Sequence, residues 1–273
     1  MDIQLDRTND GKIKINRPTR GQKSLKWILI ATAIFTVAGF FMMDYSGLVL
    51  SQAIADTLNN LYQMFLQPEL SQVGFGTAMS QVVVTLSLAF LSTILGAVIS
   101  LFLAFGTAVN LSKPWLSTLI KGVITIARAV PTVLWVLIFA IAAGLGSIAA
   151  VIGMMFHSVA YLVKAYSEAF EEIDEGKIEA LRATGSSYWQ ILFQVVIPET
   201  KSYLISWTFL RFEINFGVAV AMGAAAGAGG IGYELFMSST FYYDMNEVGM
   251  ITIIILIVAI ILELIANRLK IKA

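Results

Sequence analysis

The chain has 273 residues, of which 58% are hydrophobic and 13% charged, and its formal net charge at pH 7 is zero. Soluble domains carry about 25% charged residues, so this composition excludes an ordinary soluble protein and indicates one that crosses a membrane several times. Cysteine is absent, which excludes disulfide and thiol chemistry. We expect no nucleic acid among the partners of this chain.

Six apolar runs are long enough to span a membrane, because a hydrocarbon core of roughly 30 Å needs about 20 helical residues. Backbone polar groups cannot stay unpaired in lipid, so these runs are predicted to be helices. The predicted fold is an all-α integral membrane protein with about six transmembrane helices. They are expected at 27–43, 81–106, 118–142, 147–163, 202–226 and 248–267.

Basic residues gather near alternate ends of these runs. Seven of them precede the first run, and the positive-inside rule then places both termini in the cytoplasm. Residues 1–26 are therefore predicted to form a cytoplasmic N-terminal tail, and 27–273 the transmembrane domain. The basic front of the first run also suggests a cleaved signal peptide, but the long leader with interspersed acids argues against one.

A first external segment and a large cytoplasmic one separate the spans. Segment 44–79 carries acids but no base and is predicted to be a connector, part of which can lie along the membrane surface. Segment 164–201 is predicted to hold short helices, with Gly176 as a helix stop and a second helix over 177–184. A capping box of Ser187 and Gln190 is then expected to begin a third helix that runs toward Pro198.

One stretch in this segment, EALRATGSSYWQILFQVVIP, resembles the EAA loop of binding-protein-dependent ABC importer permeases. In that family Glu-Ala-Ala, three residues, Gly, nine residues and Ile-x-Leu-Pro recur, and the loop docks the permease onto its cytoplasmic ATPase. The glycine permits a close reversal, where a side chain would clash or a positive φ would cost energy. The departures are apolar: Leu181 replaces the second alanine, and Val195 and Ile197 replace isoleucine and leucine. The resemblance implies these ATPase-coupling residues: Glu179, Ala180, Leu181, Gly185 and Pro198.

A wider resemblance, over about 125–235 within a core of 80–267, is to the phosphonate-type permeases. It rests on Arg-Ala-Val-Pro at 128–131 with Trp135, on the Glu-Ala-Leu run, on Arg-Phe-Glu-Ile-Asn at 211–215, and on Gly-Ala-Gly-Gly-Ile-Gly at 227–232. After Asn215 this chain has Phe-Gly-Val, where the phosphonate permeases often place another arginine. That departure leaves the substrate open, though not the family.

Polar residues inside the predicted spans have two interpretations that the sequence leaves open. Arg128 lies in the third span, and Arg211, Glu213 and Asn215 lie in the fifth. An arginine at a helix centre costs roughly 2.5–3.5 kcal/mol on insertion scales unless it is paired or wetted. These residues therefore either line the path of an anion or fix the packing of helices.

The glycines after the fifth span formally match a dinucleotide-binding pattern, Gly227-x-Gly229-x-x-Gly232. They follow a helix and not a strand, so we reject nucleotide binding. Gly229 and Gly230 are expected to permit close helix approach or a bend near the outer end of the path. His157 is the sole histidine, and no metal site is expected.

The resemblance implies a type I ABC importer permease fold in the bacterial cytoplasmic membrane. It also implies a cytoplasmic ATPase dimer, a second permease copy or paralogue, and an extracytoplasmic solute-binding protein. No cofactor is expected on this chain, because ATP and Mg²⁺ are used by the ATPase, and the chain itself is not expected to be an enzyme. A phosphonate or related phosphorus oxyanion is the expected substrate. Another small solute such as an amino acid, or a secondary transporter or channel, is the alternative.

Overall fold

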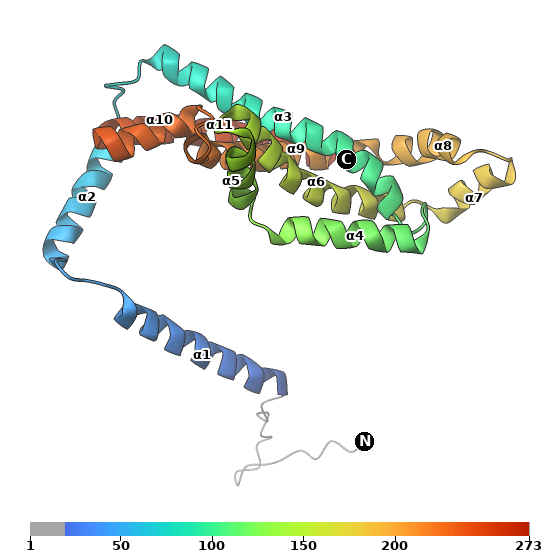
Figure 1. The fold of residues 1–273 in the computed structure, drawn as a ribbon, viewed down its shortest axis with the longest axis horizontal. Helices are drawn as coiled ribbons and strands as arrows, with labels where there is room; N and C mark the ends of the chain where they lie inside the picture. Colours follow the sequence, from blue (N-terminus) through green and yellow to red (C-terminus); the bar gives the residue numbers. More distant parts are fainter. Residues whose placement is uncertain (1–19, 273) are drawn as a thin grey trace, which may run out of the picture. The chain divides into compact units, whose positions relative to one another are not determined.

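The computed structural model describes residues 20–272, and this part of the chain is helical without strands (Figure 1). The expected all-α fold is thus confirmed, whereas residues 1–19 of the expected N-terminal tail lie outside the described residues. The helices are α1 Arg20–Met42, α2 Leu50–Leu66, α3 Phe75–Thr107, α4 Pro114–Ala129, α5 Thr132–Ala143, α6 Ser147–Glu171, α7 Glu175–Ala183, α8 Tyr188–Ile191, α9 Ile197–Ala225, α10 Ile231–Met237 and α11 Met245–Lys272, with π-helical turns η1 Leu192–Val196 and η2 Ser238–Tyr242.

The chain divides into two compact units at Asp56 and Thr57. The first unit contains α1, whose apolar side chains, such as Phe35 and Phe41, are exposed along the whole helix. Its last basic residue is Lys26, so the 16 residues that follow carry no charge. This composition suits a helix whose surface faces lipid.

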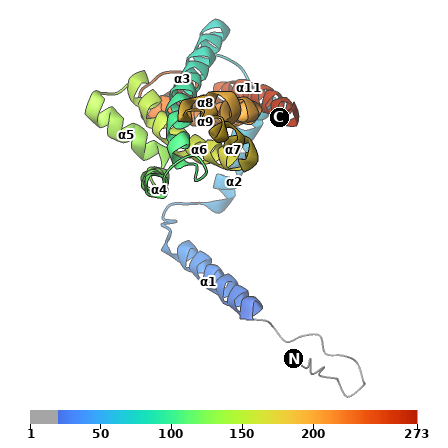
Figure 2. The same cartoon turned by 90° about the vertical axis from the view of Figure 1, so that its right-hand side faces the viewer.

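The second unit is built around α3, α6 and α9, which pack against one another in Figures 1 and 2. Small residues bring α3 and α6 together: a Cβ at Gly96 would lie 2.8 Å from the Cβ of Ser158. The same holds between α5 and α6, where a Cβ at Gly153 would lie 2.5 Å from the Cα of Val136. Without a hydrophobic driving force in lipid, such close backbone approach is what stabilises helix pairs.

The expected third span, 118–142, is not one helix. α4 and α5 meet at an angle of 88°, and α5 turns across the bundle while α4 runs along it (Figure 1). Pro131 causes the break, because it has no N–H to donate and disfavours helical geometry at Val130, whose ψ is 122°. Residues 20–272 thus contain five helices that are long and apolar enough to span a membrane, or six when the bent pair is counted as one span.

The 164–201 segment differs from its prediction at both ends. α6 ends at Glu171, and Gly176 is not a helix stop but lies in the first turn of α7. Asp174 caps that turn by accepting the Gly176 N–H at 2.9 Å. The predicted helix stop was wrong because this N-cap restarts the helix immediately before the glycine.

The helix that begins after Ser187 continues as a single run of 38 residues to Ala225. The predicted capping box of Ser187 and Gln190 at its start is confirmed. Pro198 lies in this run without ending it. The turn before the proline widens to the π pattern, with the Ile197 N–H donating to the Leu192 carbonyl, and such widened turns accommodate local irregularity within a helix.

Glycines make the turn between α9 and α10. Gly229 and Gly230 have φ of 76° and 86°, a region that L side chains rarely adopt. The Gly230 N–H donates to Gln81 Oε1, and the Ile231 N–H donates to Thr85 Oγ1, each at 2.9 Å. Side chains of α3 therefore satisfy the free N–H groups at the start of α10, and the glycine motif serves this turn.

Candidate functional site

A buried arginine lies where α9 meets α6. Arg211 is 3% exposed, its Nε donates to Ser158 Oγ at 3.2 Å, and its guanidinium carbon lies 5.4 Å from the centre of the Tyr161 ring. Its Nη2 is buried without a hydrogen-bond partner among the described residues. A buried donor without an acceptor costs about 1–3 kcal/mol, and more when it is charged.

Asn215 lies one helical turn further along α9 and joins the same cluster. Its Nδ2 donates to Thr93 Oγ1 and to Ser158 Oγ, each at 2.8 Å. Its Oδ1 is buried and, within the described part of the chain, also has no partner. The junction of α3, α6 and α9 thus holds a cation, an amide and hydroxyls in the interior, with one donor and one acceptor unused.

Glu213 does not neutralise this arginine. It is half-buried on another face of α9, and no ion pair joins it to a basic side chain in the described part of the chain. The groups around Arg211 are neutral: a hydroxyl, an amide and an aromatic ring. Among the described residues of one chain, neither Arg211 nor Glu213 forms an ion pair that would hold helices together.

A stripe of polar and aromatic side chains runs along α6 past this cluster. His157, Tyr161, Lys164 and Glu168 are spaced by four, three and four residues, which places them on one helix face. The helical spacing of these residues was visible in the sequence, but only the packing of α6 against α4 and α9 places the stripe beside the two arginines.

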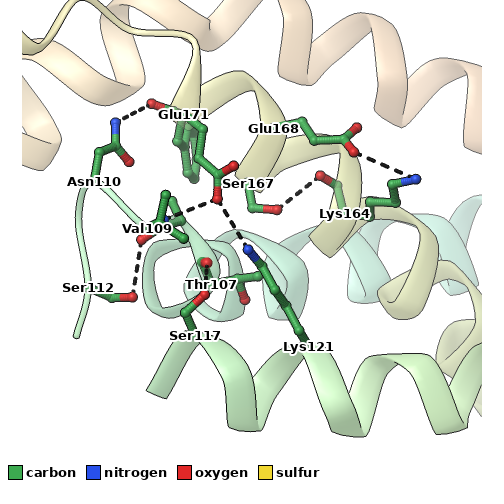
Figure 3. A network of polar contacts seen from close by, with 12 residues as sticks. Thr107, Val109, Asn110, Ser112, Ser117, Lys121, Lys164, Ser167, Glu168 and Glu171 are labelled. Atoms are coloured by element: carbon green, nitrogen blue, oxygen red, sulfur yellow. Dashed lines mark hydrogen bonds and ion pairs between the residues drawn. The ribbon is translucent and has the colours of Figure 1, made fainter. Parts of the chain in front are cut away.

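Arg128 lies in the last turn of α4 and is exposed. It lines a cavity of about 330 Å³ between α4 and α6. Figure 3 shows the polar contacts around this cavity, including the pairs of Lys121 with Glu171 and of Lys164 with Glu168. The two arginines therefore flank the α6 stripe, one buried and one beside an open cavity.

The expected coupling residues lie on a second surface, formed by α7 and the turn into α8. Glu179 and Ala180 are exposed on α7, whereas Leu181 is half-buried. The neighbouring Ile178 is 2% exposed and belongs to the hydrophobic cluster of α3, α6 and η1. The apolar side of α7 thus fixes the helix on the bundle, and its other side presents Glu179 outward.

Two exposed polar contacts link this surface to neighbouring segments. Lys177 Nζ lies 2.9 Å from Glu199 Oε2, and Arg182 Nη2 donates to the Asn110 carbonyl at 3.3 Å. Gly185 ends the helix with φ of 81°, and a Cβ there would meet nothing within 4 Å. The sequence suggested two reasons for a glycine here: a positive φ, or a clash that a side chain would cause. Within one chain the positive φ is present and the clash is not.

Pro198 and the two glycines complete the expected set. Pro198 is exposed on the first turn of α9 and is separated from Gly185 by α8 and the π turn. Gly229 and Gly230 lie at the far end of α9 from Pro198, in the turn that α3 caps. Pro198 and the two glycines therefore lie toward opposite ends of the helix that carries Arg211 and Asn215, and the other residues expected to couple lie before that helix begins.

Comparison with known families and sequences gives consistent matches. A family model described as binding-protein-dependent transport system inner membrane component matches residues 96–270. The chain is 30% identical over 228 residues to the phosphate-import permease protein PhnE of Mycolicibacterium smegmatis, covering 82% of this chain and 42% of that protein. It is 31% identical over 198 residues to the phosphite transport system permease protein PtxC of Stutzerimonas stutzeri, covering 72% and 71%.

Solved structures show the same fold at lower identity. The inward-facing MetNI methionine ABC transporter matches with a TM-score of 0.64 and 22% identity, over 75% of this chain and all of that chain. A bacterial ABC transporter involved in alginate import matches with a TM-score of 0.61 and 14% identity, over 93% and 99%. The chain matches less than half the length of the Mycolicibacterium relative.

Proposed function

We propose that this chain, which belongs to the family of binding-protein-dependent transport system inner membrane components, is a multi-pass ABC importer permease of the cytoplasmic membrane. Its substrate would be a phosphonate or a related phosphorus oxyanion. The names of the relatives support the substrate class, since two of them are permeases for phosphate and phosphite. We propose further that ATP hydrolysis resides in a separate subunit, and that this chain holds no cofactor of its own.

The observation that carries the substrate proposal is the unpartnered Nη2 of the buried Arg211. A guanidinium is always charged and presents a planar fork that matches two oxygens of a phosphate or phosphonate group. In a dry interior this group gains most from an anion, because no carboxylate of the described residues neutralises it. The free Nη2 of Arg211 would then donate to the anion, and the α6 stripe would lead it toward Arg128 and the inner cavity.

The coupling proposal rests on the surface of α7. Glu179 and Ala180 would contact a cleft of the ATPase, while Leu181, Gly185 and Pro198 would set the shape and direction of the segment. α7 is short, and its buried Ile178 packs in one hydrophobic cluster with Leu192 and Val196 just before α9, so a push on α7 would pass to the start of α9. Because the helix from Tyr188 to Ala225 is continuous, that displacement would reach Arg211 directly.

The assembly we propose has two permeases, as copies or paralogues, an ATPase dimer that binds ATP and Mg²⁺, and an extracytoplasmic solute-binding protein. Both termini and the 164–201 segment would lie in the cytoplasm. ATP-driven closure of the ATPases would move α7 and open the path outward, where the binding protein releases its ligand. Resetting would then expose the anion to the inner cavity.

Uptake of radiolabelled phosphonate, phosphite, phosphate and methionine tests the substrate proposal in cells that express the complete transporter. We expect uptake of a phosphorus oxyanion, its loss in Arg211→Gln, and partial uptake in Arg211→Lys, which keeps the charge without the fork. Arg268→Gln is the matched control, because Arg268 is an exposed arginine near the end of α11. Methionine uptake without oxyanion uptake would replace the proposal with an amino-acid permease.

A further inference from the structure

The cavity between α4 and α6 is rich in charge and has an excess of positive groups. Its volume is about 330 Å³, and its charged lining consists of Lys121, Arg128, Lys164, Glu168 and Glu171. Bases outnumber acids by one, which favours an anion over a cation as occupant. The cavity lies at the inner end of α6, beyond the buried Arg211 cluster.

Two ion pairs occupy four of these five charges, and both are weak. Lys121 Nζ lies 3.4 Å from Glu171 Oε1, and Lys164 Nζ lies 3.6 Å from Glu168 Oε1. The side chains of these pairs are between 29% and 57% exposed, and exposed pairs of this kind contribute little to stability. An incoming anion can therefore take over either lysine at small cost.

Arg128 is the fifth charged residue of the lining and takes part in neither ion pair. Among the described residues no carboxylate pairs with it. The hydroxyls of the cavity do not compete for an anion, since Thr107, Thr125 and Ser167 each donate to a main-chain carbonyl of their own helix. The cationic groups are thus the donors that the lining offers to an anion.

The helix that carries Arg128 directs it toward the protein. α4 is amphipathic, with Ser117 and Ile124 buried on the same face as Lys121 and Arg128. The opposite face carries exposed apolar side chains: Trp115, Leu119, Val123 and Ile126. The charged face of α4 therefore lines the cavity, and its apolar face points away from the bundle.

We propose that this cavity binds a phosphate-type oxyanion, to which Arg128 donates two hydrogen bonds and Lys121 and Lys164 contribute their ammonium groups. A free anion or the phosphate of a lipid head group supplies the same chemistry. Binding would separate Lys164 from Glu168 within α6. It would also separate Lys121 from Glu171, the ion pair that joins α4 to α6. This site adds a second anion-binding position to the proposed transport path. It rests on the proposed function only for the statement that a free anion reaches the cavity from the Arg211 cluster.

Isothermal titration of the purified full chain with inorganic phosphate tests the site, in detergent free of phosphate and of anionic lipid. We expect the wild-type chain to bind phosphate and Arg128→Gln to bind at least about tenfold more weakly, the loss typical of a charged hydrogen bond. Lys164→Gln should weaken binding less, because Lys164 already has a partner. Arg268→Gln removes an exposed arginine outside the cavity and should bind like the wild type.

Arg128→Lys keeps the proposal testable if Arg128→Gln does not fold, because it retains the charge and should bind with intermediate affinity. Nanodiscs of phosphatidylcholine, with and without phosphatidylglycerol, distinguish the sources. Loss of phosphate binding only with phosphatidylglycerol assigns the site to a lipid head group, and equal binding in both assigns it to the free anion. Equal affinity of the wild type and Arg128→Gln, or no binding by the wild type, overturns the site. The assay needs neither ATPase nor uptake, so its failure is distinguishable from failure of the proposed transport.

Discussion

Arg211 of α9 and Tyr161 of α6 face each other, with the guanidinium carbon 5.4 Å from the ring centroid. The pair lies beside Ser158, whose hydroxyl oxygen accepts from both Arg211 and Asn215. A ring and two neutral groups stabilise a cation less than a carboxylate does, and a desolvated cation–π contact contributes about 2 kcal/mol. The arginine is therefore held in place but not neutralised, as expected of a group that receives an anion.

Arg211→Met should separate function from stability. The substitution removes a buried charge that has no carboxylate partner and fills its volume with an apolar side chain, so the unfolding temperature should stay level or rise. Transport should be lost in the same variant. Thermal unfolding in detergent and uptake in cells give the two readouts. A marked fall in unfolding temperature would instead assign Arg211 to helix packing.

Charge reversal at the α7 surface should uncouple the motor. Glu179→Lys changes an exposed side chain, and Gly185→Trp forces a bulky residue to φ of 81° at a local cost of about 1–2 kcal/mol. Both variants should insert and fold, while ATPase co-purification and uptake fall. Asp56→Lys reverses an exposed charge in α2 and serves as control. Normal uptake with Glu179→Lys and Gly185→Trp combined would show that this loop does not couple the ATPase.

Close packing where α10 meets α9 should not tolerate a methyl group. A Cβ at Gly232 would collide with the carbonyl oxygen of Val220, and overpacking of this kind costs about 1–3 kcal/mol. Gly232→Ala should therefore lower the unfolding temperature. Gly217→Ala is the matched control on α9, because a Cβ at that position meets nothing within 4 Å. Equal effects of the two variants would argue against this contact.

Acid should weaken the N-terminus of α11. Hydrogen bonds from the Ser71 hydroxyl and from the Glu247 N–H hold the pKa of Asp244 below its ordinary value. Because the folded-state pKa is lowered, Asp244 stabilises the fold above its ordinary pKa, and this contribution is lost as the pH falls below about 4. Asp244→Asn should therefore lose less stability between neutral and acid pH than the wild type. Denaturant titrations in detergent at several pH values measure the difference, and parallel pH curves would contradict it.

Local sequence was enough for much of the architecture. Apolar run length predicted the spanning helices, and the capping box at Ser187 was predicted because its two partners lie within one turn. The spacing from Glu179 to Pro198 led to the family because the whole pattern lies within one short stretch of sequence. The break at Pro131 was missed because a hydropathy window averages over a bend and carries no direction, although the proline itself was visible.

The site depended on contacts between distant segments, which only the tertiary structure decides. Arg211 was known to need a partner, but Ser158 and Tyr161 come from a helix about fifty residues earlier. In the same way Gln81 and Thr85 of α3 cap the start of α10. The sequence determined which residues are costly to bury, since that cost is a property of the side chain. Which neutral or charged groups meet them depends on how the helices pack, and that packing is set by small side chains scattered along α3, α6 and α9.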